Sequence, residues 1–170
     1  MRTSTFALFL GIAYLSIGLL GLIPAALMPP SAEAPPVRFN WLYGELFGLF
    51  AVNVAHSIAH LATGAWGIMA WRGIGSPKLF ARSIAILYGA LALMGLIPGV
   101  DTLFGVLPMH GHDVWLHLAS AALAAHFGWR REAAVEHRAS TREDRRSEVL
   151  PVEHEHRVRQ NDRRLPFNEV

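Results

Sequence analysis

The sequence predicts an all-α fold, a four-helix transmembrane bundle built from two parallel helix-pair repeats. Three observations predict it. Hydrophobic residues make up 52% of the 170 residues, and they gather in four segments near the length of about 20 residues that spans a bilayer. Residues 1–129 hold nine charged side chains, whereas residues 130–170 hold nineteen. Two pairs of segments also repeat within the chain. We therefore expect a transmembrane domain over 1–129 and a charged cytoplasmic tail over 130–170, partly helical and then disordered.

The four helices are expected at about 5–28, 53–71, 79–98 and 113–129. The first apolar run exceeds the 7–15 residues of a signal-peptide core, so we expect it to be retained. The second begins at Asn53, a good N-cap residue, and the apolar residues before it are expected at the membrane interface. The third has the right length for one span. The fourth begins near Asp113, because Pro108 and Gly111 break a helix.

The repeat is visible by direct alignment. "YLSIGLLGLIP" at 14–24 aligns with "YGALALMGLIP" at 88–98, and "LFGLFAVNVAHSIAHLA" at 46–62 aligns with "LFGVLPMHGHDVWLHLA" at 103–119. His60 then falls on His117, and His56 falls on Asp113. This pattern is typical of a parallel duplication in which both helix pairs have the same orientation.

Basic residues predict the orientation. Arg72, Lys78 and Arg82 flank the connection between the second and third helices, whereas Arg38 is the only basic residue in the loops at the other end. The positive-inside rule then places both termini in the cytoplasm of a multi-pass protein of the bacterial inner membrane. The lipid bilayer is the expected partner, and a homo-oligomer is left open. The interleaved charges of the tail do not predict nucleic-acid binding.

Polar residues inside the second and fourth helices are the candidate site. His56 and His60 share one helix face, as do Asp113 and His117. The expected polar cluster near the outer face comprises Asn53, His56, His60, His110, Asp113 and His117. Imidazoles with a carboxylate suit a transition metal, and histidines on facing helices can hold haem, so His56, His60, Asp113 and His117 are the candidate ligands. The alternatives are a polar lock that fixes helix register and a path for protons or small solutes. Thr63 and Ser120, which align in the repeat, are expected to form hydrogen bonds between helices.

Several chemistries are excluded. The chain has no cysteine, so disulfides and thiolate metal sites are absent. It contains no His-Glu-x-x-His, Gly-x-Ser-x-Gly, phosphate-loop or dinucleotide-binding motif. We therefore expect a protein that is not an enzyme and has no catalytic residues. No cofactor is expected, and a metal ion or haem is the alternative.

The motifs resemble a bacterial membrane family of unknown function, domain of unknown function 4383. A Val-Asn-x-x-His-x-x-x-His-Leu pattern covers 52–61, and an Asp-x-x-Leu-His pattern covers 113–117. The likeness extends over about 5–129, implies a four-helix membrane protein and implies no known reaction. A second asparagine is expected where His110 stands. A looser likeness links the fold to DoxX-type four-helix membrane proteins.

The preferred sequence-based hypothesis is a small structural or accessory inner-membrane protein whose His/Asp cluster locks the second and fourth helices together. The competing hypothesis is a metal- or haem-binding component in redox chemistry or transport.

Overall fold

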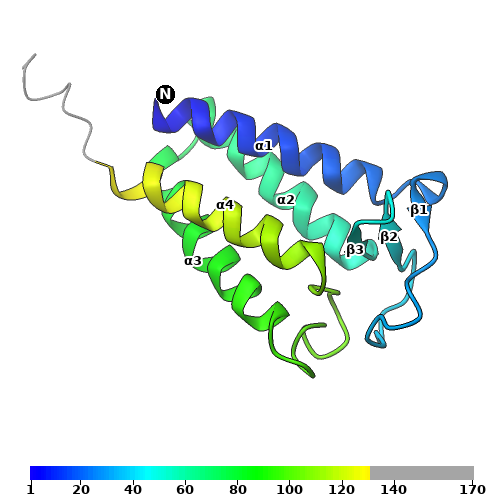
Figure 1. Ribbon diagram of the computed structural model, residues 1–170. Coiled ribbons are helices and arrows are strands. Elements are labelled where there is room, and N and C mark those ends of the chain that lie inside the picture. The colour runs from blue at the N-terminus through cyan, green and yellow to red at the C-terminus, as the bar shows by residue number, and fades with distance from the viewer. Residues whose placement is uncertain (131–170) are drawn as a thin grey trace, which may run out of the picture. The chain divides into compact units, whose positions relative to one another are not determined.

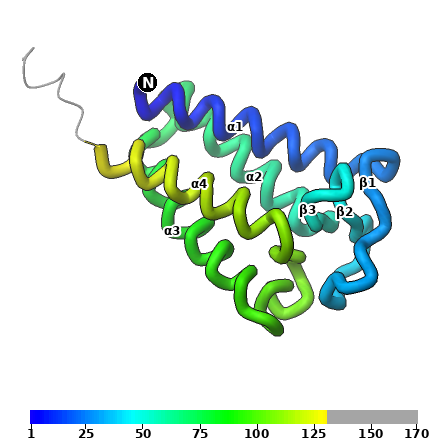
Figure 2. Tube along the Cα trace, in the orientation of Figure 1, coloured from blue at the N-terminus to red at the C-terminus, as the bar shows by residue number. Residues whose placement is uncertain are grey.

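The computed structural model describes residues 1–130, which form one compact unit. Four α-helices dominate this unit and lie side by side (Figures 1 and 2). They are α1 (Thr3–Leu20), α2 (Val54–Trp71), α3 (Pro77–Gly95) and α4 (His112–Trp129). The expected tail, 130–170, lies outside the described residues except for Arg130.

A small sheet joins the helices, and it corrects the purely helical expectation. After a short 3-10 helix at Pro24–Ala26, strands β1 (Leu27–Met28), β2 (Gly44–Leu46) and β3 (Phe50–Val52) form an antiparallel sheet in the order β1-β2-β3. We call the end of the helices that carries this sheet the sheet end. The first helix is accordingly shorter than the expected 5–28. It stops at Leu20, with Gly21 as its C-cap and Pro24 soon after, and proline cannot continue a helix.

Local sequence explains where the other helices begin. The Asn53 side chain accepts a hydrogen bond from the His56 amide and so caps α2, as the sequence predicts. Ser76 caps α3 in the same way, with Pro77 at the first helical position, where its missing N–H costs nothing. Gly111 precedes α4 with φ of 66°, a conformation that favours glycine.

The helices associate mainly in two pairs, α1 with α2 and α3 with α4. Glycines bring the backbones of the first pair together. A Cβ added at Gly64 would lie 2.5 Å from the Leu15 nitrogen, and one at Gly11 would lie 2.9 Å from the Gly64 oxygen. In the second pair, the Arg82 Nε donates to the Gly128 carbonyl at 2.9 Å. Small residues at helix interfaces are typical of packing in membranes.

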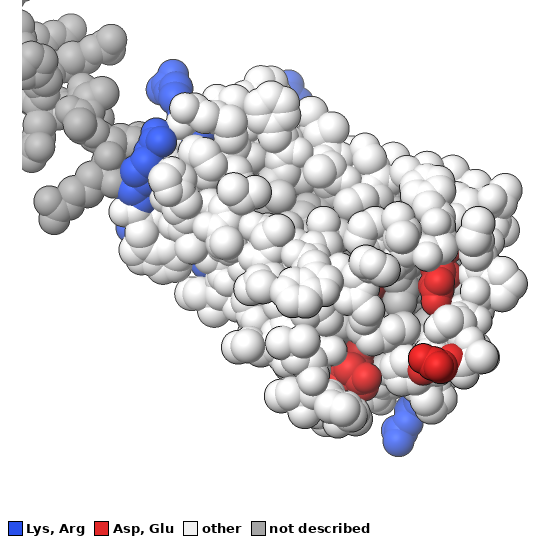
Figure 3. All heavy atoms as spheres, in the orientation of Figure 1, with Lys and Arg blue, Asp and Glu red and all other residues white. Residues whose placement is uncertain are grey.

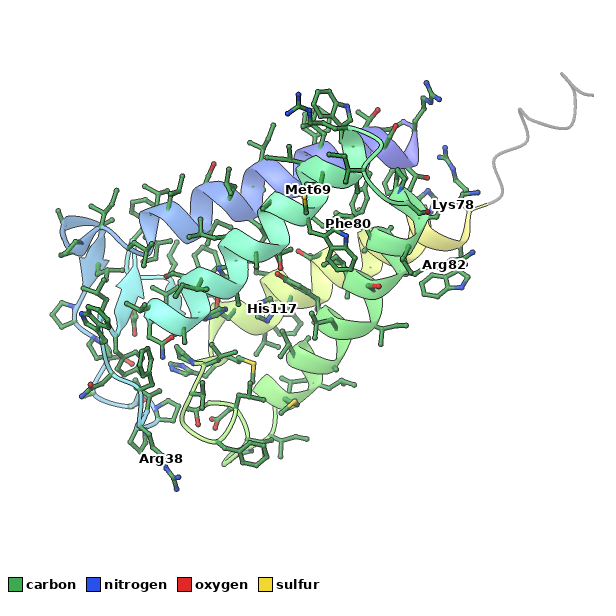
Figure 4. All side chains as sticks on the ribbon, turned by 180° about the vertical axis from the view of Figure 1, so that it is seen from behind. Arg38, Met69, Lys78, Phe80, Arg82 and His117 are labelled. Carbon is green, nitrogen blue, oxygen red and sulfur yellow. The ribbon has the colours of Figure 1, made fainter. Side chains whose placement is uncertain are left out.

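Many large apolar side chains are exposed on the helices, and several polar side chains are buried between them. The buried face of α2 includes His56, Ser57, His60 and Thr63, whereas exposed residues include Ile58, Ile86, Leu93 and Leu123. On the face shown in Figure 3, most Lys and Arg side chains lie at the end where α1 begins, and Asp and Glu lie at the sheet end, where Arg38 is also found (Figure 4). The surface between the two ends is uncharged on this face. Two helices, Thr3–Leu20 and Pro77–Gly95, are long and apolar enough to cross a membrane.

The interior is divided along its length. The half near the start of α1 is filled by an apolar cluster that includes Phe6, Ala7, Phe80 and Ala124. The Phe6 and Phe127 rings stack at 4.7 Å, and Phe80 points inward between the helices (Figure 4). The half nearer the sheet holds the buried histidines and Asp113, so the ionisable groups of the interior lie at one end.

Candidate metal site

Three histidines converge inside the half nearer the sheet. His56 and His60 come from α2, and His117 comes from α4 (labelled in Figure 4). Each offers one ring nitrogen, and these three atoms all lie within 4.8 Å of one another. All three side chains are buried, at 1–3% exposure. Their placement follows from the helix repeat: residues four apart lie on one face, and this face of α2 meets the buried face of α4.

His56 is held in a defined orientation. Its Nδ1 lies 3.1 Å from the Ala51 carbonyl oxygen. A carbonyl can only accept, so Nδ1 carries the proton and Nε2 keeps its lone pair. A backbone carbonyl that holds one nitrogen of an imidazole is the usual outer support of a metal-binding histidine, because it fixes the tautomer.

Among residues 1–130, no hydrogen-bond partner is found for the ring nitrogens of His60 and His117. This holds for both Nδ1 and Nε2 of each residue, although both rings are buried. The His56 and His60 rings lie 4.3 Å apart, and the His60 and His117 rings lie 6.2 Å apart. Buried polar groups are nearly always satisfied in native proteins. Four unsatisfied nitrogens in one place therefore indicate a missing partner.

Two buried tyrosines support the histidines from the side of the apolar core. Tyr14 of α1 contacts the His60 ring at 5.0 Å, and Tyr88 of α3 contacts the His117 ring at 4.9 Å. The Tyr14 hydroxyl bonds Ser120 Oγ at 2.8 Å, and the Tyr88 hydroxyl donates to Thr63 Oγ1 at 3.1 Å. The expectation that Thr63 and Ser120 form interhelical hydrogen bonds is confirmed. Neither tyrosine was predicted as part of the site, although both occupy equivalent repeat positions.

Asp113 shares the buried face of α4 with His117, one helical turn away. Its side chain is fully buried, and neither carboxylate oxygen forms a hydrogen bond with another residue of 1–130. The backbone of Ala51 nevertheless interacts favourably with the carboxylate. Asp113 is in the first turn of α4, where the helix dipole favours negative charge. Its oxygens do not belong to the group formed by the three histidine nitrogens, which lie within 4.8 Å of one another.

The other two expected members of the polar cluster have different roles. Asn53 is fully buried, and its amide group is fully engaged: Nδ2 donates to the Phe39 and Val106 carbonyls at 2.8 and 2.7 Å, and Oδ1 caps α2. It ties two loops to the helix and is not free to hold a ligand. His110 is in the loop before α4, and its Nε2 lies 3.4 Å from the Tyr43 hydroxyl.

Burial changes the acidity of these two loop residues, His110 and Tyr43. It lowers the pKa of His110, and the nearby carboxylates of Asp101 and Glu45 oppose that effect. Burial also raises the pKa of Tyr43, and the same two carboxylates raise it further. The neutral form of His110 is therefore favoured, and this loop is sensitive to acid.

The sequence matches the model of one known protein family. The family model for "Domain of unknown function (DUF4383)" matches residues 4–130. The chain belongs to this family. The match covers all four helices, the sheet and the three converging histidines, as the sequence motifs predict. No curated protein and no solved structure gives a significant match.

Proposed function

We propose that this DUF4383 protein is a small integral membrane protein that binds a transition-metal ion through His56, His60 and His117. The three-histidine geometry carries the proposal. Three nitrogens around a tetrahedral ion lie roughly 3.3 Å apart, given metal–nitrogen distances of about 2.0–2.1 Å. The nitrogens within 4.8 Å of one another reach that arrangement through small side-chain rotations.

The energetics favour a metal over a purely structural polar lock. A lock requires the α2 and α4 histidines to hydrogen-bond with each other or with Asp113. Within residues 1–130, the ring nitrogens of His60 and His117 form no such bond. Each unsatisfied buried polar group costs about 1–3 kcal/mol. A bound ion satisfies these groups, and structural zinc sites supply about 10–16 kcal/mol.

Haem binding and solute passage have less support than a metal ion. A porphyrin needs open space around the axial histidines, but the rings of Tyr14 and Tyr88 pack against His60 and His117. A path across the membrane needs polar groups along its whole length. The interior between the histidines and the start of α1 is instead filled by Phe6, Phe80 and their apolar neighbours.

The membrane setting rests on the exposed apolar side chains of the helices. Large apolar side chains cover much of the outside, while histidines and an aspartate are buried inside, an arrangement that lipid favours and water does not. Exposed Trp71 and Trp129 lie at one end of the helices, and exposed Trp41 and Trp115 lie at the other, as expected for interfacial belts. The basic end then faces the cytoplasm, and the sheet end faces outward.

The parallel repeat is part of the same proposal. Tyr14 and Tyr88 are equivalent positions, and each bonds a hydroxyl of the other helix pair, Ser120 and Thr63 respectively. Each also contacts a histidine, and His60 and His117 are themselves equivalent. These matched contacts relate α1–α2 to α3–α4 in the way that a duplicated pair requires.

Metal analysis of the purified full-length protein tests the function. The protein in lipid nanodiscs is incubated separately with Zn²⁺, Cu²⁺ or Fe²⁺, passed over a mild chelating resin and analysed for bound metal. We expect about one ion per chain for at least one of the metals, and a loss of this ion in His60→Ala and His117→Ala. His126→Ala, which alters an exposed histidine of α4, should retain it. Equal retention by all variants, or no retained metal in the wild type, would refute the proposal.

A further inference from the structure

We propose that Asp113 is the fourth ligand of this ion, so that the centre combines three imidazoles with one carboxylate and takes a divalent first-row cation. This inference rests on the proposed metal binding and specifies the kind of ion. Two ligands then come from α2 (His56 and His60) and two from α4 (Asp113 and His117), each pair four residues apart.

The position of Asp113 is fixed by its neighbours. His117 is one helical turn away on the same face. Ala51 connects Asp113 to His56, since the Ala51 carbonyl accepts from the His56 ring and the Ala51 backbone also interacts with the Asp113 carboxylate. The Tyr14 hydroxyl interacts electrostatically with Asp113, and the Tyr14 ring contacts His60. The carboxylate thus lies on the buried α4 face that carries His117, and it shares the Ala51 backbone with the His56 ring.

The two unsatisfied oxygens of Asp113 are an observation independent of the histidines. A buried carboxylate whose oxygens form no hydrogen bond is costly, and a cation is a partner that offsets this cost. Within residues 1–130, the other acidic residues are Glu33, Glu45 and Asp101, and none of them is fully buried. Asp113 is therefore the acidic group placed to offset the charge of an ion held by neutral imidazoles.

The carboxylate also determines which ion is favoured. Carboxylate oxygen is a hard ligand that favours ions such as Zn²⁺, Fe²⁺ or Mn²⁺, whereas Cu⁺ favours softer ligands and gains little from it. Removal of the Asp113 charge should consequently weaken the binding of divalent ions much more than that of Cu⁺.

Metal affinities of the full-length protein in nanodiscs test this inference, with chelating dyes as competitors for Zn²⁺ and Cu⁺ at constant pH. Asp113→Asn keeps the size of the side chain and removes its charge. We expect the Kd for Zn²⁺ to rise by about 100-fold, the upper end of the effect of losing even an outer support of a site. The Kd for Cu⁺ should change by less than about threefold. Asp101→Asn removes a carboxylate from a loop at the same end of the molecule and should leave both affinities unchanged.

The outcomes separate this inference from the function on which it rests. If the wild type binds no metal, metal binding itself is refuted. If it binds metal and Asp113→Asn changes the Zn²⁺ affinity by less than about threefold, only the role of Asp113 is overturned. An equal loss in Asp101→Asn would also overturn it, because the effect would then be a general one of charge. Without metal, Asp113→Asn should unfold at the same temperature as the wild type or higher, since an amide is cheaper to bury than a carboxylate; this measurement excludes misfolding as the cause.

Discussion

Gly64→Ala tests the close contact between α1 and α2 that positions two of the histidines. A Cβ at Gly64 would lie 2.5 Å from the Leu15 nitrogen and 2.8 Å from the Gly11 oxygen. Ordinary contact begins at 3.4 Å, so α1 must move away by about 0.6–0.9 Å. The atoms that obstruct the methyl group belong to the backbone, so no side-chain rotation can relieve the clash.

The expected cost of Gly64→Ala is about 2 kcal/mol, within the range of about 1–3 kcal/mol for overpacking. This cost corresponds to a melting temperature about 4–8 °C lower for a chain of this size. Tryptophan fluorescence during heating of the nanodisc-embedded protein measures the change. Gly89→Ala is the matched control, because a Cβ there meets only the Ala121 Cβ at 3.9 Å. Equal melting temperatures for Gly64→Ala and the wild type would refute the close backbone contact.

Three further predictions concern the surroundings of the site. Asn53→Ala should cost about 2–4 kcal/mol, from a lost N-cap and from unpaired Phe39 and Val106 carbonyls, and thermal unfolding measures it. Tyr88→Phe should lower the free energy of unfolding by about 0.5–1.5 kcal/mol, because it removes the hydrogen bond to Thr63; an unchanged melting temperature would argue against that bond. Burial lowers the pKa of His110, so the unfolded loop takes up a proton first as the pH falls below about 6.5; stability present above that pH is lost below it. Hydrogen exchange of residues 97–111, corrected for intrinsic rates, should show more opening at pH 5.5 than at pH 7.5, and less difference in His110→Gln.

Direct alignment of the sequence with itself identified the positions that meet in the interior. His60 and His117 occupy equivalent positions, as do Thr63 and Ser120, and all four side chains are buried. Helix periodicity correctly placed His56 and His60 on one face, because residues four apart must share a face whatever surrounds the helix. Asn53 was recognisable as a cap because its residue type and position suit that role.

The sheet and the exact membership of the site could not be predicted in the same way. Strands of two or three residues are too short to show alternation, and β1–β3 pair through their backbones. Asn53 and His110 were expected in the polar cluster, but loop conformation decides which groups they meet. Asn53 is occupied by two loop carbonyls, and His110 turns toward Tyr43. Residue spacing carries no information about either contact.

If the protein spans a membrane as proposed, the division of the interior affects how charge is separated across it. Charge at the histidines and Asp113 would be separated from the cytoplasmic side by a plug of phenylalanine and alanine side chains. Moving an ion through such a dry, low-dielectric layer costs many kcal/mol. In the proposed orientation, the protein can hold a cation near the outer surface without providing a route for ions across the bilayer. Ion gradients across the membrane are therefore maintained.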